Sequence, residues 1–169
     1  MNPLRLIAPV LLALCAGQAG VVTAQESPPA GAAKVVYYPA LANGPAVLDQ
    51  ALAKAAASNH RAVIVFGADW CHDSRALAKV LTSEAFKTEF SARYDVTLID
   101  VGRPQTGAGR NLELVTRLGV KNLKSTPALF VIAPQGKLLN GNKDAVSWRN
   151  AESRGTDKIL AWFRSFDKK

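Results

Sequence analysis

The chain has 169 residues and a formal net charge of +8, with 21 lysines and arginines against 13 aspartates and glutamates. The basic residues are scattered, and no dense basic run or interleaved aromatic pattern argues for nucleic-acid binding, so we expect an ordinary basic surface. The 2 cysteines and 2 histidines form no set of convergent metal ligands in the sequence. We predict neither a metal site nor a cofactor.

The first 24 residues have the pattern of a secretory signal. An apolar stretch at 6–16 has the length of a signal core and is too short to cross a bilayer, and Val-Thr-Ala at 22–24 fits a cleavage site. We therefore expect export, with a mature chain that begins at Gln25 and keeps no stable membrane anchor. A lipoprotein signal with Cys15 as the lipidated residue is the competing interpretation, but Leu14 is bulky where such signals need a small residue.

Cleavage would leave one cysteine, Cys71. No internal disulfide could then form, although exported proteins usually carry paired cysteines. A lone cysteine in such a protein indicates a reactive thiol, an intermolecular bridge or a buried inert residue. Residues 25–34 include Ser-Pro-Pro-Ala-Gly and are predicted to be a flexible lead-in. One domain is expected over residues 35–169, which is long enough to bury a core.

Apolar runs with the spacing of strands and helices follow one another along this domain. Strands are predicted at 35–38, 62–68, 96–101, 128–132 and 137–139. Helices are predicted at 45–58, 74–81, 84–92 and 111–118, with a last helix that starts at Thr156. The segments at 102–110 and 140–155 are predicted to be connections. Alternation first and a hairpin last predict an α/β fold, with a mixed central sheet flanked by helices on both faces.

The most informative stretch is Trp-Cys-His-Asp-Ser at 70–74, between the strand predicted at 62–68 and the helix that follows it. At this junction Cys71 meets the first backbone N–H groups of the helix, which lack partners within the helix. Those donors and the helix dipole favour a thiolate over a thiol. Cys71 is therefore the candidate nucleophile.

A second motif, Ser-Thr-Pro at 125–127, lies directly before the strand predicted at 128–132. With the first motif and the order of elements, it makes the chain resemble the thioredoxin superfamily over about residues 35–166. The resemblance implies a thioredoxin-like three-layer fold. It also implies a cis peptide bond before Pro127, which would face Cys71.

The same resemblance implies roles for other residues around the cysteine. Trp70 would flank the site, and the backbone at Thr126 and Pro127 would pair with an extended client chain. Because the similar members are exported bacterial proteins, the resemblance implies a periplasmic location, with secretion as the alternative.

His72 and Asp73 follow the cysteine in the first turn of the predicted helix. As an imidazolium, His72 would stabilise a neighbouring thiolate, and otherwise it is a solvated residue at the helix start. Asp73 suits the positive end of the helix dipole, but its charge opposes a nearby thiolate. The two effects partly cancel, so their net influence on Cys71 stays open.

The sequence departs from the family pattern at two positions. The second cysteine of the motif is replaced by Ser74, whose hydroxyl can donate a hydrogen bond to a Cys71 thiolate but cannot resolve a mixed disulfide. The buried carboxylate that family members often carry on the strand below the cysteine is replaced by Val65. A dithiol reductase cycle is therefore not expected. A laboratory Cys-to-Ser replacement would give the same residue at position 74.

Two functions are left open. In the first, the chain is a monothiol oxidoreductase or isomerase: Cys71 forms a mixed disulfide with a client protein, and a client thiol or a small thiol such as glutathione resolves it. In the second, the chain is a redox-inactive binding or chaperone-like module, and Cys71 is vestigial or forms one lasting bridge to a partner. The intact Trp-Cys and Thr-Pro pairs favour the first. Hydrolytic catalysis is not indicated, because no nucleophile and base are suitably spaced.

Overall fold

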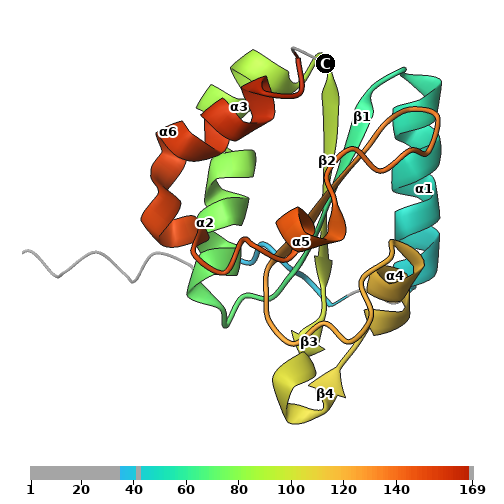
Figure 1. Cartoon of the computed structure of the whole chain (residues 1–169), viewed down its shortest axis with the longest axis vertical. Helices are drawn as coiled ribbons and strands as arrows, with labels where there is room; N and C mark the ends of the chain where they lie inside the picture. The colour runs from blue at the N-terminus through green and yellow to red at the C-terminus, as the bar shows by residue number, and fades with distance from the viewer. Residues whose placement is uncertain (1–34, 41–42, 168–169) are drawn as a thin grey trace, which may run out of the picture. The chain divides into compact units, whose positions relative to one another are not determined.

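The computed structural model describes residues 35–40 and 43–167, which Figure 1 colours from blue to red. By its internal contacts the chain divides into two units, Met1–Lys34 and Val35–Lys169, and only the second contains described residues. The signal peptide predicted at 1–24 and the lead-in predicted at 25–34 lie outside the described residues.

A mixed three-stranded sheet forms the centre of the domain (Figure 1). Strand β1 (Arg61–Gly67) lies in the middle, parallel to β2 (Tyr94–Asp100) and antiparallel to β5 (Ala128–Ile132). In the register, Val65 lies opposite Leu98 on β2 and Leu129 on β5. The central strand is almost wholly buried, as its continuous apolar run predicts.

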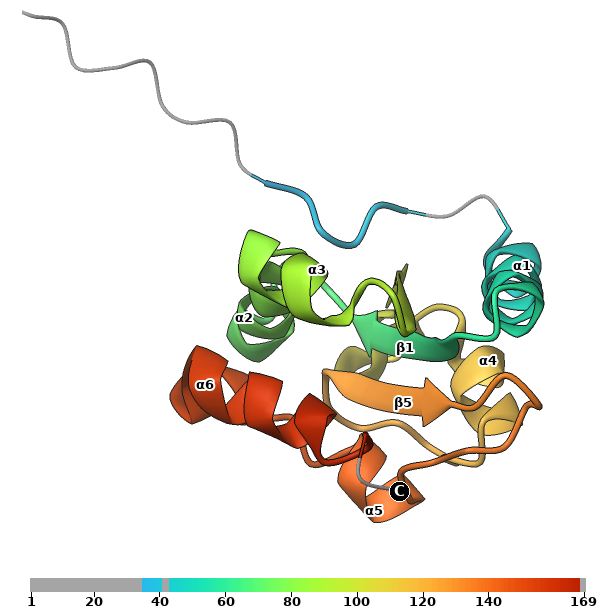
Figure 2. The same cartoon turned by 90° about the horizontal axis from the view of Figure 1, so that it is seen from above.

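Helices cover both faces of the sheet, as Figures 1 and 2 show. On one face lie α2 (His72–Leu81), α3 (Glu84–Phe90) and α6 (Ala151–Arg164), and on the other lie α1 (Gly44–Ala57) and α4 (Leu112–Arg117). Successive residues of a strand point to opposite faces. Accordingly, Val63 and Val65 pack with α2 and α6, whereas Ile64 and Phe66 pack with α1 and α4. This is the predicted three-layer fold.

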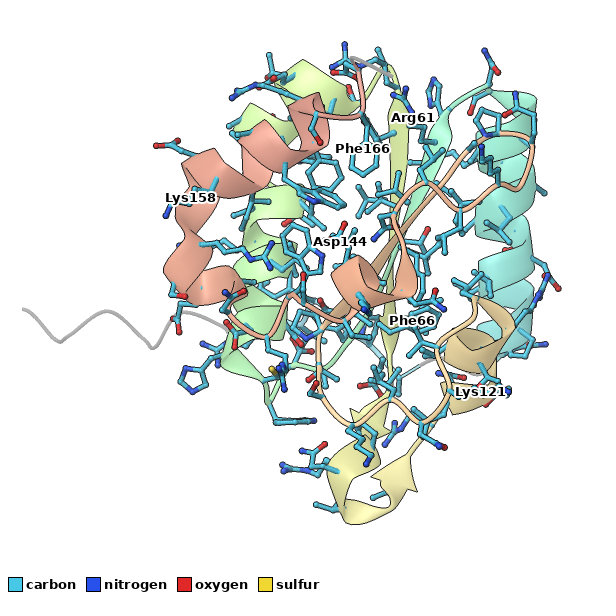
Figure 3. All side chains as sticks on the ribbon, in the orientation of Figure 1. Arg61, Phe66, Lys121, Asp144, Lys158 and Phe166 are labelled. Carbon is cyan, nitrogen blue, oxygen red and sulfur yellow. The ribbon has the colours of Figure 1, made fainter. Side chains whose placement is uncertain are left out.

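Aromatic side chains fill the space between the sheet and α6. Ile159 and Phe163 are buried, Phe166 is 5% exposed and Trp162 packs against the same cluster, so the apolar side of the last helix faces the core. Figure 3 labels Phe166 in this layer and Phe66 in the cluster on the other side of the sheet. Each face thus has its own apolar core.

The first and the last of the predicted strands are not formed. Residues 35–38 are not a strand, because the N–H groups of Tyr37 and Tyr38 donate to the Asp69 carboxylate, at 3.0 and 3.1 Å, rather than to a neighbouring strand. The hairpin partner predicted at 137–139 is reduced to one bridge, between Ile132 and Leu138.

A buried asparagine explains why that hairpin stops. The side chain of Asn140, 4% exposed, accepts a hydrogen bond from the Val131 N–H and donates one to the Leu129 carbonyl, each at 2.8 Å. These bonds satisfy the edge of β5 in the way a longer partner strand would.

Both predicted connections contain regular structure. Residues 102–110 form a small excursion with β3 (Gly102–Arg103), a short 3₁₀ helix (Pro104–Thr106) and β4 (Ala108–Gly109). The segment at 140–155 holds α5 (Asn142–Ala145) and the first turn of α6. Gly155 breaks α6 with a φ of 72° and a ψ of 165°, so the regular part of the last helix does start after it, at Thr156.

Candidate functional site

Cys71 lies where β1 leads into α2. Its N–H donates to the Ala68 carbonyl at 3.1 Å, and its extended backbone, with a φ of −88° and a ψ of 124°, makes it the N-cap of α2. Its side chain is not used for capping and is partly exposed. The sulfur therefore sits at the positive end of a ten-residue helix with access to solvent.

The second motif lies directly against this sulfur. The Thr126–Pro127 peptide bond is cis, and the Cys71 thiol donates to the Thr126 carbonyl, with 3.5 Å between sulfur and oxygen. Thr126 is 5% exposed. The two motifs, 55 residues apart in the chain, thus meet as the resemblance implied.

Ser74 is fully buried in the first turn of α2. Its hydroxyl has no hydrogen-bond partner among the described residues, and neither has that of Thr126. The hydrogen bond that Ser74 can donate to the sulfur of Cys71 is therefore not formed in this structure. Each of these two buried hydroxyls therefore has a donor that is not used, one in the helix that Cys71 caps and one in the residue whose carbonyl contacts Cys71. Such unpaired groups are unusual, because buried polar groups are normally hydrogen-bonded.

Trp70 flanks the cysteine. Its indole Nε1 donates to the Gly102 carbonyl at 2.8 Å, and the Arg103 guanidinium carbon lies 5.1 Å from its ring centroid. The side chain is nevertheless 36% exposed. The 102–110 excursion therefore fixes the ring while one part of it still faces solvent.

His72 and Asp73 both face α6. An Asp73 carboxylate oxygen accepts a hydrogen bond from the Glu152 backbone N–H at 2.9 Å, in the first turn of α6. His72 is exposed, with its Nδ1 4.0 Å from a Glu152 carboxylate oxygen. Asp73 therefore holds the start of α6 against the start of α2, a structural contact that the sequence did not indicate.

Val65 packs below the helix that carries Cys71, at the position where family members often have a carboxylate. It is fully buried on the α2 face of β1, among the apolar side chains of that layer. This face of the strand offers no group for proton transfer at that position.

Sequence reasoning missed Tyr38 and Asp69. Tyr38 is 4% exposed, and its hydroxyl donates to the Ser74 carbonyl at 3.0 Å. Burial raises the pKa of Tyr38, and the charges of Cys71 and Asp69 raise it further. Gly67 allows the close approach of this ring, because a Cβ at Gly67 would lie 2.5 Å from the Tyr38 ring. Tyr38 thus supports the first turn of α2 through the Ser74 carbonyl.

A pocket of about 250 Å³ opens beside Trp70. Its lining comes from three segments of the chain, and the residues are Tyr38, Asp69, Trp70, Asp100, Gly102, Arg103, Ala108 and Arg110. Of these residues only Trp70 was predicted to belong to the site, because the others lie outside the two motifs.

Two further observations concern the described residues alone. Within 35–40 and 43–167, no helix is both long and apolar enough to cross a membrane. Over the same ranges, histidine, cysteine, aspartate and glutamate side chains form no cluster of three that could hold a metal ion.

A cysteine at a helix start, opposite a cis-proline on a mixed three-layer α/β fold, defines the thioredoxin class. Comparison with known families agrees: a model described as a thioredoxin-like domain matches residues 48–148. The chain therefore belongs to the thioredoxin superfamily.

A solved structure is also similar, described as that of a disulphide isomerase from Xylella fastidiosa Temecula1. It shares 28% sequence identity and a TM-score of 0.69 with this chain, over 80% of this chain and 99% of that one. A search of curated proteins gave no match.

Proposed function

We propose that this chain is an exported thiol–disulfide exchange protein that works through the single thiol of Cys71. The observation that carries the proposal is the position of this sulfur, partly exposed at the start of α2 and in contact with the Thr126 carbonyl before Pro127. The similarity to a structure described as a disulphide isomerase supports thiol–disulfide chemistry as the general activity.

The proposed reaction has two exchange steps. The Cys71 thiolate attacks one sulfur of a client disulfide, the client S–S bond breaks, and the other client sulfur leaves as a thiolate. A thiolate of the client or of glutathione then attacks the mixed disulfide and releases Cys71 as a thiolate. When the client supplies both sulfurs, its disulfides are rearranged without net oxidation or reduction. When glutathione supplies the thiols, the client disulfide is reduced and glutathione is oxidised.

The neighbours of Cys71 have defined parts in these steps. The unused hydroxyls of Ser74 and Thr126 are donors for the negative sulfur that forms when the thiol ionises. The backbone around Thr126 and Pro127 binds the extended client beside the sulfur. Ser74 has no sulfur, so release of the client depends on a second molecule or on the client itself.

The test is the reactivation of a protein with scrambled disulfides in a glutathione buffer. We expect the chain to accelerate reactivation, and Cys71→Ser to reduce the rate to that of buffer alone. Cys15→Ser is the matched control, because it makes the same replacement at the other cysteine, and it should keep the full rate. Equal rates with Cys71→Ser and the unmodified chain would rule out the proposal.

A second candidate function is a redox-inactive binding module. The observation that favours it is Trp70, which offers an exposed aromatic surface whether or not Cys71 reacts. For this function, Cys71→Ser should leave capture of an unfolded client unchanged, whereas Trp70→Ala should weaken it.

A further inference from the structure

The pocket beside Trp70 contains one cation, Arg103, that makes no ion pair with any described residue. Two carboxylates line it, and both are already bonded. Asp69 accepts the N–H groups of Tyr37 and Tyr38. Asp100 accepts the Gly102 N–H at 3.2 Å and pairs with the Arg110 guanidinium, also at 3.2 Å.

Arg103 differs from Arg110 in this respect. Its guanidinium stacks near the Trp70 ring, and it makes no ion pair within the described part of the chain. An arginine on an aromatic ring presents its N–H donors in one plane, and this geometry fits the two oxygens of a carboxylate. Arg103 is thus placed to bind an anionic group against Trp70, one residue before the reactive sulfur.

Other charged residues around Cys71 do not line this pocket. On the α6 side, the Asp73 carboxylate accepts the Glu152 backbone N–H, and the Glu152 carboxylate lies 4.0 Å from the Nδ1 of His72. Arg75 and Lys124 are exposed, and neither makes an ion pair in the described ranges. Of the four charged residues that line the pocket, Asp100 and Arg110 pair with each other, and Asp69 and Arg103 make no ion pair in the described ranges. Arg103 is therefore the lining cation whose donors are free for a ligand.

We infer that the pocket makes the protein select disulfides that carry a carboxylate a few bonds from the sulfur, with Arg103 binding that carboxylate while Cys71 attacks. The inference rests on the proposed function and adds a substrate class to it. The exchange itself is unchanged: the Cys71 thiolate forms one S–S bond, the substrate S–S bond breaks, and the carboxylate-bearing thiolate leaves.

The experiment compares three small disulfides of matched length: dithiodipropionate (anionic), bis(2-hydroxyethyl) disulfide (neutral) and cystamine (cationic). The full chain carries Cys15→Ser so that Cys71 is its only thiol. The rate of adduct formation is measured at low salt by intact mass. The rate with the anionic disulfide is divided by the rate with the cationic one. This ratio is then divided by the ratio that free 2-mercaptoethanol gives with the same two disulfides, which corrects for their intrinsic reactivity.

We expect the corrected ratio to be above one for the chain. Arg103→Glu should lower this ratio about fivefold or more, because the reversed charge repels the anionic disulfide and attracts the cationic one. Arg103→Gln should give an intermediate ratio and Arg103→Lys should restore most of it. Lys137→Glu is the matched control, since it makes the same charge change on an exposed residue beyond the opposite end of β5.

The outcomes separate the two proposals. If all three disulfides react and Arg103→Glu leaves the ratio unchanged, or Lys137→Glu lowers it equally, the pocket does not select and the inference is wrong while the exchange function stands. If none of the three reacts with Cys71, the exchange function fails and the inference with it. Rates with the neutral disulfide check that each variant is folded, and they should match that of the unmodified chain.

Discussion

Phe163→Ala should lower the free energy of unfolding by about 3–5 kcal/mol, the range found for truncation of a buried phenylalanine. Phe163 is fully buried, and its ring centroid lies 5.0 Å from that of Phe86, 5.8 Å from Phe90, 5.5 Å from Tyr94 and 4.9 Å from Trp162. Truncation removes the centre of this cluster and leaves a cavity between α6, α3 and β2. Urea unfolding followed by circular dichroism measures the loss.

The control for this prediction is Val36→Ala. Val36 is 61% exposed, so its truncation should change the free energy of unfolding by less than about 0.5 kcal/mol. A loss below about 1 kcal/mol for Phe163→Ala, in a transition as cooperative as that of the unmodified chain, would show that α6 does not dock on this face of the sheet.

Ser74→Cys should convert the chain into a dithiol protein. Residues 71 and 74 lie three apart at the start of α2, which brings their side chains onto one face. The Ser74 hydroxyl has no partner, so the replacement breaks no hydrogen bond. The new thiol would attack a mixed disulfide at Cys71 from within the same molecule and shorten its lifetime by at least ~100-fold.

The measurement is the survival of a glutathione adduct at Cys71 after free glutathione is removed, in chains that also carry Cys15→Ser. Ser91→Cys is the matched control: Ser91 is exposed at the end of α3, the helix that follows the C-terminal end of α2, and its replacement should leave the adduct long-lived. An adduct that survives equally in Ser74→Cys would mean that the side chain at position 74 cannot reach the sulfur of Cys71.

The sequence predicted the elements whose apolar pattern is long and unbroken. β5 has the predicted bounds, Ala128–Ile132, because all five residues are buried and polar segments flank them. α2 begins at His72 and not at Ser74, because the first turn of this helix is polar and shows no apolar period. The 102–110 excursion was missed because strands of two residues are too short to have a period.

The residues of the site likewise fall into those that the sequence predicted and those that it did not. Cys71, Thr126 and Pro127 were predicted to meet, because both motifs resemble those of a family with a known arrangement. Tyr38 and Asp69 could not be predicted, since their hydrogen bonds join residues more than thirty positions apart and neither lies in a motif. Arg103 was treated as one of many surface cations, and only the structure brings it to Trp70.

The most direct test of the central claim is the reaction of Cys71 with glutathione disulfide, followed by intact mass and peptide mapping of the full chain. We predict one glutathione bound at Cys71, no adduct there in Cys71→Ser, and complete release by reduced glutathione, so that the thiol is regenerated. A Cys71 that stays unmodified under conditions in which an unfolded chain is modified would contradict the account. It would leave the chain as a binding module on a thioredoxin fold.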